Sequence, residues 1–145
     1  MNRTITVKMI VLAAVLTLVA CNTPKEVSFI EAHNYFVRND APMPVPTKIT
    51  TQEEFDSVFG MAAYMGADGQ PTPIDFTAQF ILPVVLPVTD TETQIVPLKV
   101  ECRDNSLLYT YQIQTGEQLS FSIRPLSIII LDKQWANYDI ILKSE

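Results

Sequence analysis

The residues that could carry out covalent or acid–base chemistry are few in this 145-residue chain. There is one histidine, His33, and there are two cysteines, Cys21 and Cys102. A serine or cysteine nucleophile usually needs a histidine beside it, and zinc needs three or four soft or imidazole ligands. The four glycines provide no Gly-rich phosphate-binding loop. We therefore expect no catalytic residue, no metal site and no cofactor, and we predict that the protein is not an enzyme.

The carboxylates lack the regular short spacing that a calcium-binding loop requires. Asp75 lies between Ile74 and Phe76, where we expect it to accept backbone hydrogen bonds at a turn. Asp90 and Glu92 are predicted at a hairpin tip, residues 89–93. They could pair as acid and base, but two carboxylates at a tip are also typical of a solvated turn.

The first twenty residues have the pattern of an export signal. Arg3 and Lys8 precede a run, residues 9–20, that is apolar except for Thr17. This run is too short for a bilayer span, which needs roughly 20 residues, and it has the proportions of a signal-peptide core.

The end of this run, Leu18-Val19-Ala20-Cys21, resembles the lipobox of bacterial lipoproteins. The resemblance implies cleavage before Cys21, diacylation of its sulfur and acylation of the new amine with palmitate-type chains. Each buried methylene contributes about 0.8 kcal/mol, so two or three chains anchor a protein permanently. We expect a cell-envelope protein held to a membrane outside the cytoplasm. The alternatives are an ordinary secretory peptide or a short anchor helix that contains a cysteine.

The net charge narrows the possible partners. Residues 1–20 hold two of the ten basic residues and none of the sixteen acidic ones, so the rest has a formal net charge of 8 − 16 = −8. Nucleic acid and anionic lipid surfaces both require a basic face, and we exclude them as partners of the mature domain. An acidic surface also serves solubility alone.

The domain organisation follows from these segments. We predict a signal peptide over residues 1–20, a lipidated tether over 21–26 and a single β-rich domain over 27–145. With Cys21 acylated, we expect no disulfide within the domain. Cys102 lies on the same side of a strand-like run as Val100, which favours a buried, inert thiol over a catalytic one.

One helix is predicted. Thr51 can cap it and Glu54 falls three residues later, as in a capping box. Phe55, Val58 and Phe59 share one face, and Gly60 can end the helix. A Pro-rich loop, residues 39–46, precedes it.

The remaining chain alternates like β-structure. Asp104–Asn105 and Thr115–Glu117 are predicted turns, and the prolines at 83 and 87 indicate an edge or bulged strand. The predicted strands are residues 27–38, 80–88, 94–102, 106–114, 119–131 (bent at Pro125) and 138–143. We expect an α+β fold, an antiparallel meander with one short helix packed on it.

Two aromatic groups could bind a ligand or a partner. Tyr109, Tyr111 and Phe121 could form a row that stacks a sugar or receives a peptide, although a sheet face covered by the helix explains them equally well. Trp135 and Tyr138 lie in a predicted loop and could form a contact patch, as aromatic residues do at interfaces.

Three segments resemble the PrcB-type domain, which is found in small Bacteroidetes lipoproteins and in a subunit of a secreted protease complex. They are Gln52–Phe59, Ile74–Phe76 and Phe121–Pro125 leading into Ile128–Ile130, within about residues 49–143. The resemblance implies an α+β fold and a protein-binding role. The Gly-Gly-Tyr loop of that family has no counterpart, and Val88–Gln94 occupies the corresponding hairpin.

Two function classes follow. The first is a non-catalytic protein-interaction module with an unknown envelope partner, to which the resemblance adds association with a protease. Trp135, Tyr138, Asp90 and Glu92 are its candidate contacts. The second is a small-ligand or glycan-binding accessory lipoprotein. The first requires an open sheet edge or an exposed apolar patch, and the second requires a concave pocket with convergent polar groups.

Overall fold

The computed structural model describes residues 21–145. The predicted signal peptide, residues 1–20, lies outside the described residues. The elements in chain order are β1 (Cys21–Val27), β2 (Ile30–Ala32), β3 (Tyr35–Val37), α1 (Gln52–Val58), β4 (Phe59–Met61), β5 (Gln79–Val85), β6 (Thr89–Asp104), β7 (Ser106–Ile123), β8 (Leu126–Asp132), the 3-10 turn η1 (Lys133–Trp135) and β9 (Asp139–Ser144). The α+β class is confirmed, with one short α-helix packed against sheets.

One long antiparallel ribbon organises the molecule. Its first arm is β5 followed by β6, and its second arm is β7 followed by β8. The arms are joined at the predicted tight turn Asp104–Asn105, where Asp104 has a φ of 49°. The ribbon bends at residues 86–88 and 124–125, where the N–H of Leu86 donates to the carbonyl of Pro125 at 3.0 Å. Because proline supplies no N–H and fixes φ, Pro87 and Pro125 favour a break in both arms at this bend.

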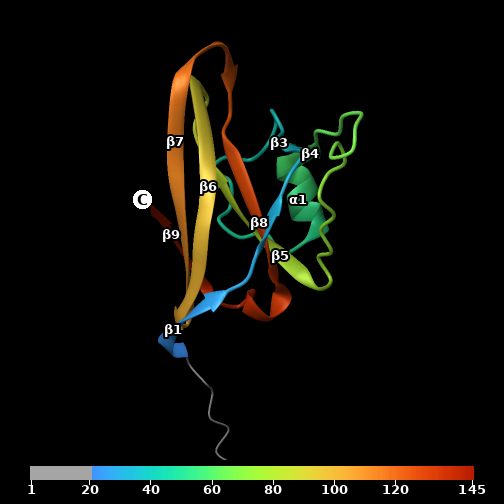
Figure 1. Ribbon diagram of the computed structural model, residues 1–145. Helices are drawn as coiled ribbons and strands as arrows, with labels where there is room; N and C mark the ends of the chain where they lie inside the picture. The colour runs from blue at the N-terminus through green and yellow to red at the C-terminus, as the bar shows by residue number, and fades with distance from the viewer. Residues whose placement is uncertain (1–20) are drawn as a thin grey trace, which may run out of the picture.

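The bend folds the ribbon into two facing sheets (Figure 1). The outer sheet has the order β1-β6-β7-β9, and the central sheet has the order β2-β8-β5. Their facing side chains form one core that includes Phe80, Leu82, Val100, Leu107 and Tyr109. The domain is therefore a small β-sandwich with one face of its central sheet left for the helix.

The helix and the small β3-β4 sheet form a third layer on that remaining face. The second core contains Phe55, Val58 and Phe59 together with Ile81, Ile128 and Ile130 from the central sheet, as well as Ile49 and Phe76. Covered on both faces, β5 and β8 are continuous apolar runs rather than alternating ones.

The predicted helix start is confirmed, but its predicted end is wrong. The Thr51 hydroxyl accepts a hydrogen bond from the N–H of Glu54 at 3.2 Å. Gly60 does not end the helix, because the chain passes directly into β4 at Phe59. A Cβ at Gly60 would lie 2.5 Å from the Phe36 ring, so a close ring approach explains this glycine.

The prediction of a turn at Thr115–Glu117 is wrong. Strand β7 continues through these residues, and the pairs Thr93↔Thr115 and Thr91↔Gln118 leave one extra residue on β7. Such a bulge satisfies the same local preference for glycine without reversing the chain.

A second bulge changes which residues of β6 face the core. Between Pro97↔Tyr111 and Lys99↔Thr110 the residue Leu98 has no partner, and it is 42% exposed. Simple alternation along the predicted strand 94–102 would place Val96, Leu98 and Val100 on one face, and the bulge shows that this expectation is wrong. One extra residue inverts the alternation, so that Ile95 is buried before the bulge and Val100 after it.

The N-terminal segments also differ from expectation. The segment predicted as a tether, residues 21–26, belongs to β1. Strand β1 pairs with β6 at the edge of the sheet through backbone groups, so a polar sequence is compatible with this pairing. The single strand predicted over 27–38 is divided, with Asn34 at a φ of 65° between β2 and β3. The strand order is not that of a simple meander, because β5 pairs with β8 and β9 runs parallel to β7.

Cys102 is fully buried in the core of the sandwich, as the alternation predicted. Within residues 21–145 there is no helix long and apolar enough to cross a membrane.

The buried Tyr109 provides a test of this core by pH. Burial raises the pKa of its hydroxyl to about 12. Since the unfolded-state pKa is about 10, the folded state retains the proton longer, and stability present below pH 10 is lost as pH rises towards 12. Over that interval the loss should be roughly 2 kcal/mol. Tyr109→Phe should flatten this decline in urea unfolding measured from pH 8 to 12.

The exposed Tyr64 supplies the matched control, and Tyr64→Phe should leave the alkaline decline unchanged. An identical decline in the wild type and in Tyr109→Phe would contradict the placement of this hydroxyl in the core.

Candidate functional site

A groove runs along the side of the sandwich, between the edges of β9 and β5. Its volume is about 380 Å³. One wall comes from the Pro-rich loop with Met43, Pro44, Val45 and Thr47, and the other walls come from Pro83, Val84, Val85, Leu86, Pro87, Tyr111, Arg124 and Leu142. Eleven of these twelve residues carry no charge. The groove therefore suits apolar side chains and a single anionic group.

Strand β9 borders this groove with an open edge. The N–H of Asp139 donates to the Asn105 carbonyl at 3.0 Å, and the N–H of Glu145 donates to the backbone carbonyl of Tyr111 at 2.9 Å. These two N–H groups therefore face β7. Alternate residues of a strand direct their N–H groups to opposite sides. The N–H groups that face away from β7 are those of Ile140, Leu142 and Ser144. Among residues 21–145 no strand pairs with this side of β9.

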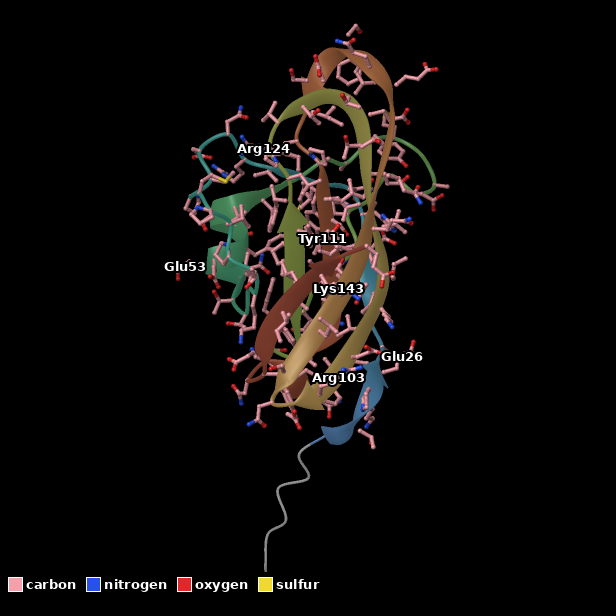
Figure 2. The ribbon with its side chains drawn as sticks, turned by 90° about the vertical axis from the view of Figure 1, so that its left-hand side faces the viewer. Glu26, Glu53, Arg103, Tyr111, Arg124 and Lys143 are labelled. Carbon is pink, nitrogen blue, oxygen red and sulfur yellow. The ribbon has the colours of Figure 1, made fainter. Side chains whose placement is uncertain are left out.

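Arg124 is the only charged residue of the groove, and it is exposed. The ion pairs within residues 21–145 are Arg38–Asp40, Lys99–Glu101 and Lys143–Glu145, and none of them includes Arg124. Figure 2 shows Tyr111 and Lys143 near the end of β9 on one side of the molecule, with Arg124 further towards the bend of the ribbon. A guanidinium without a carboxylate partner is thus available to a ligand in a chain that is acidic overall.

A lysine next to the groove-lining Thr47 ties the segment before α1 to the loop before β9. The Nζ of Lys48 donates to the Ala136 carbonyl at 2.7 Å and to the Tyr138 carbonyl at 3.2 Å. This contact fixes the segment before α1 against the loop before β9.

The sequence-predicted aromatic pair, Trp135 and Tyr138, is not an open patch. Trp135 and Tyr138 are half-buried against the sandwich core, and their ring centroids are 5.3 Å apart. The Nζ of Lys25 lies 5.7 Å from the centroid of the Trp135 ring. These contacts give the pair a packing role, and the partly exposed ring edges remain the part that could touch a partner.

Asp90 and Glu92 are not at a hairpin tip, because residues 89–93 belong to β6. Both side chains are exposed, and Asp90 accepts a hydrogen bond from the Gln118 amide at 3.3 Å. The Glu92 carboxylate lies over Gly116 of the bulge. Alternation places both residues on one face of the ribbon, away from the groove lining.

The other residues considered for chemistry are not brought together. Asp75 accepts hydrogen bonds from the N–H and hydroxyl of Thr77 at 2.9 and 2.6 Å, and these bonds hold the pKa of its carboxyl below the usual value. His33 is exposed, and its backbone N–H donates to the Thr72 hydroxyl at 2.9 Å. Within residues 21–145 no three potential metal ligands gather in one place.

The aromatic row is divided between the core and the surface. Tyr109 is fully buried, Tyr111 lines the groove and Phe121 is 61% exposed. The helix does not cover this face as expected, because α1 packs on the opposite side of the central sheet. The expectation that the row belongs to the core is correct for Tyr109, whereas Tyr111 belongs to the candidate site.

Sequence reasoning missed most of the groove. It identified Tyr111 and the prolines at 83 and 87, but not Arg124, Leu142 or the Pro-rich loop as one site. Pro83 and Pro87 were a usable signal, because a strand that lacks donors lies at a sheet edge. The meeting of this edge with β9 depends on the bend of the ribbon.

Cys21 and the groove lie far apart along the long axis of the sandwich. Cys21 is paired with Asp104, whereas Tyr111 is paired with Pro97, seven residues away along β6. At about 3.3 Å per residue this separation is roughly 23 Å. In Figure 2, Glu26 and Arg103 mark the end near β1 and Arg124 lies towards the opposite end. The groove thus lies far from Cys21 along the sandwich.

Comparison of the chain with protein-family models, with curated proteins and with solved structures gives no match. The resemblance to the PrcB-type domain stays a prediction.

Proposed function

We propose that this protein is a lipid-anchored lipoprotein of the bacterial cell envelope that binds another protein and catalyses no reaction. Acylation of Cys21 holds it to a membrane outside the cytoplasm. The domain then presents a binding surface to an envelope partner, in keeping with the protease-associated role that the PrcB-type resemblance implies.

The observation that carries this proposal is the open edge of β9 beside an apolar groove. An edge strand exposes unpaired backbone groups that can pair with an extended segment of another chain. The groove adds pockets for the apolar side chains of that segment. Edge pairing provides affinity through the backbone, and the groove provides selectivity.

The position of the groove relative to Cys21 supports the same proposal. A roughly 23 Å separation, from a rise of about 3.3 Å per residue, lies between the groove and the proposed point of attachment. A partner in the surrounding compartment can then reach the β9 edge.

The proposal is tested by capture of partners from envelopes of cells that express the tagged full chain. Ser144→Pro removes one outward N–H and adds a ring at the β9 edge, while the hydrogen bonds to β7 remain. Loss of one backbone hydrogen bond should reduce the binding free energy by about 1.4 kcal/mol, which corresponds to a tenfold weaker complex. We expect capture to fall by about this factor. Ser144→Ala keeps the N–H and should capture partners as the wild type does.

Thermal melts of the two variants show whether both remain folded. Equal capture by folded Ser144→Pro and the wild type would contradict binding at this edge. Capture of no protein by the wild type would contradict the proposed function. Turnover of an ester, peptide or glycoside by the purified wild type would contradict the absence of catalysis.

The groove itself favours a second candidate, an accessory lipoprotein for a small apolar ligand. Its volume of about 380 Å³ is at the low end of ligand pockets, which are about 300–1,000 Å³. A small molecule that occupied the groove would bind equally well to Ser144→Pro, since it needs no backbone pairing. The same pair of variants therefore separates the two functions.

A further inference from the structure

We propose that the segment bound along β9 is an extended, apolar peptide that places a carboxylate against Arg124. This inference rests on the proposed function and specifies the chemistry of the partner. It follows from the location of Arg124, from the composition of the groove and from the geometry of the β9 edge.

Leu142 links the edge to the groove. Its N–H belongs to the set that faces away from β7, and its side chain lines the groove. A peptide that pairs with this N–H lies alongside β9, where alternate side chains of an extended chain point to the same side. Every second side chain of the peptide is therefore directed towards the groove.

The groove selects apolar side chains at those positions. Leu142 and Val84 form part of its walls, and Met43 from the Pro-rich loop, half exposed at 52%, forms part of its rim. A flexible methionine at a rim can adapt to side chains of different shape. Burial of Met43 and of the incoming side chains removes apolar surface from water, which favours binding.

Arg124 provides the one charge-specific contact. It is exposed on the groove and belongs to none of the ion pairs within residues 21–145. A guanidinium binds a carboxylate through two parallel hydrogen bonds, and such charge-assisted bonds are about twice as strong as neutral ones. The apolar surroundings leave Arg124 as the single determinant for a negative group.

The position of Arg124 favours a peptide carboxylate over a lipid phosphate. Arg124 lies at the bend of the ribbon, whereas Cys21 pairs with Asp104 near the opposite end. With an anchor at Cys21, the Arg124 end is the end of the sandwich farther from the point of attachment. The open β9 edge beside it also pairs with a peptide backbone, which a lipid lacks.

The test uses mature protein purified from cells that express the full chain. A library of random nonapeptides displayed on phage is selected against it, and the enriched sequences are read. We expect alternating apolar residues and an acidic residue at a constant distance from them. Enrichment of peptides without an acidic residue, or no enrichment at all, would overturn the inference.

The enriched peptides are then synthesised in three forms: with a free C-terminal carboxylate, with a C-terminal amide, and with a C-terminal amide and the acidic residue replaced by its amide. These forms distinguish a side-chain carboxylate from a chain terminus. Loss of a charge-assisted hydrogen bond should weaken binding to Arg124→Gln by roughly tenfold or more, measured by fluorescence polarisation. Arg124→Lys should restore part of the affinity, because lysine keeps the charge but not the planar pair of donors.

Arg38→Gln is the matched control, since Arg38 is also an exposed arginine but lies outside the groove and is paired with Asp40. It should bind the peptides as the wild type does. If Ser144→Pro abolishes peptide binding while Arg124→Gln leaves it unchanged, the carboxylate inference is wrong and the proposed protein-binding function stands. If neither variant changes peptide binding, the inference is wrong, and the envelope capture experiment decides the proposed function independently.

Discussion

Replacing Phe55 with alanine is expected to destabilise the domain by about 3–5 kcal/mol, the range for truncation of a buried phenylalanine. The Phe55 ring is only 4% exposed and forms the centre of an aromatic cluster. Its centroid lies 5.2 Å from that of Tyr35, 5.1 Å from that of Phe59 and 5.5 Å from that of Phe76. Truncation therefore leaves a cavity between α1 and the central sheet, and urea unfolding measures its cost.

Thr51→Ala provides a comparison within the same helix. It removes the capping hydroxyl but no buried surface, so its expected cost is about 1 kcal/mol. A Phe55→Ala variant as stable as the wild type, or no more destabilised than Thr51→Ala, would mean that the helix is not docked on the sheet. The structure would then be wrong in its third layer.

Replacing Cys21 with serine is expected to abolish attachment to the membrane. A serine hydroxyl cannot form the thioether to a diacylglyceryl group, and in the lipoproteins that Leu18–Cys21 resembles, normal cleavage before the cysteine depends on that modification. The cell should contain uncut precursor or a soluble product. Two or three acyl chains supply many kcal/mol, at about 0.8 kcal/mol per buried methylene, so the change in membrane fractionation should be near complete.

Cys102→Ala is the matched control, because Cys102 is the other cysteine and is buried in the sandwich core. It should mature and fractionate with membranes as the wild type does, even if its stability falls. A Cys21→Ser variant that matures and fractionates identically to the wild type would contradict the lipoprotein assignment. Mass spectrometry of the mature N-terminus distinguishes lipid from an uncleaved leader.

The elements that could be predicted are those whose signal is local. The cap at Thr51 and the face of Phe55 and Val58 depend on three- and four-residue spacing. The turn at Asp104–Asn105 and the alternation from Leu107 to Ile113 depend on neighbours in one strand.

The elements that could not be predicted depend on contacts between distant residues. Leu98 forms a bulge because the facing segment of β7 has one residue fewer than β6. The sequence of β6 alone does not contain this information. Gly116 sits in a strand instead of a turn because β6 continues beside it as far as Thr89. The parallel pairing of β9 with β7 likewise results from the path of the chain through η1.

The candidate site was predictable only in part for the same reason. A proline-containing edge strand could be recognised at Pro83, and an aromatic at Tyr111. Arg124 had no local signal, since it joins the groove only because the ribbon bends beside Pro125. In the structure Trp135 packs against the core and Asp90 lies within strand β6. The candidate site is therefore at the β9 edge.

The proposed pairing of an envelope protein with the β9 edge can be tested by photocross-linking in living cells. A photoreactive amino acid is placed at Ser144 of the full chain, and at Glu53 on α1 as an exposed control on another face (Figure 2). We expect a discrete protein adduct from position 144. It should be absent from position 53, and it should be lost when Leu142 is also replaced by proline in a variant that still folds. The same adducts from both positions, or none from position 144 in cells that contain the folded protein, would contradict the proposed pairing.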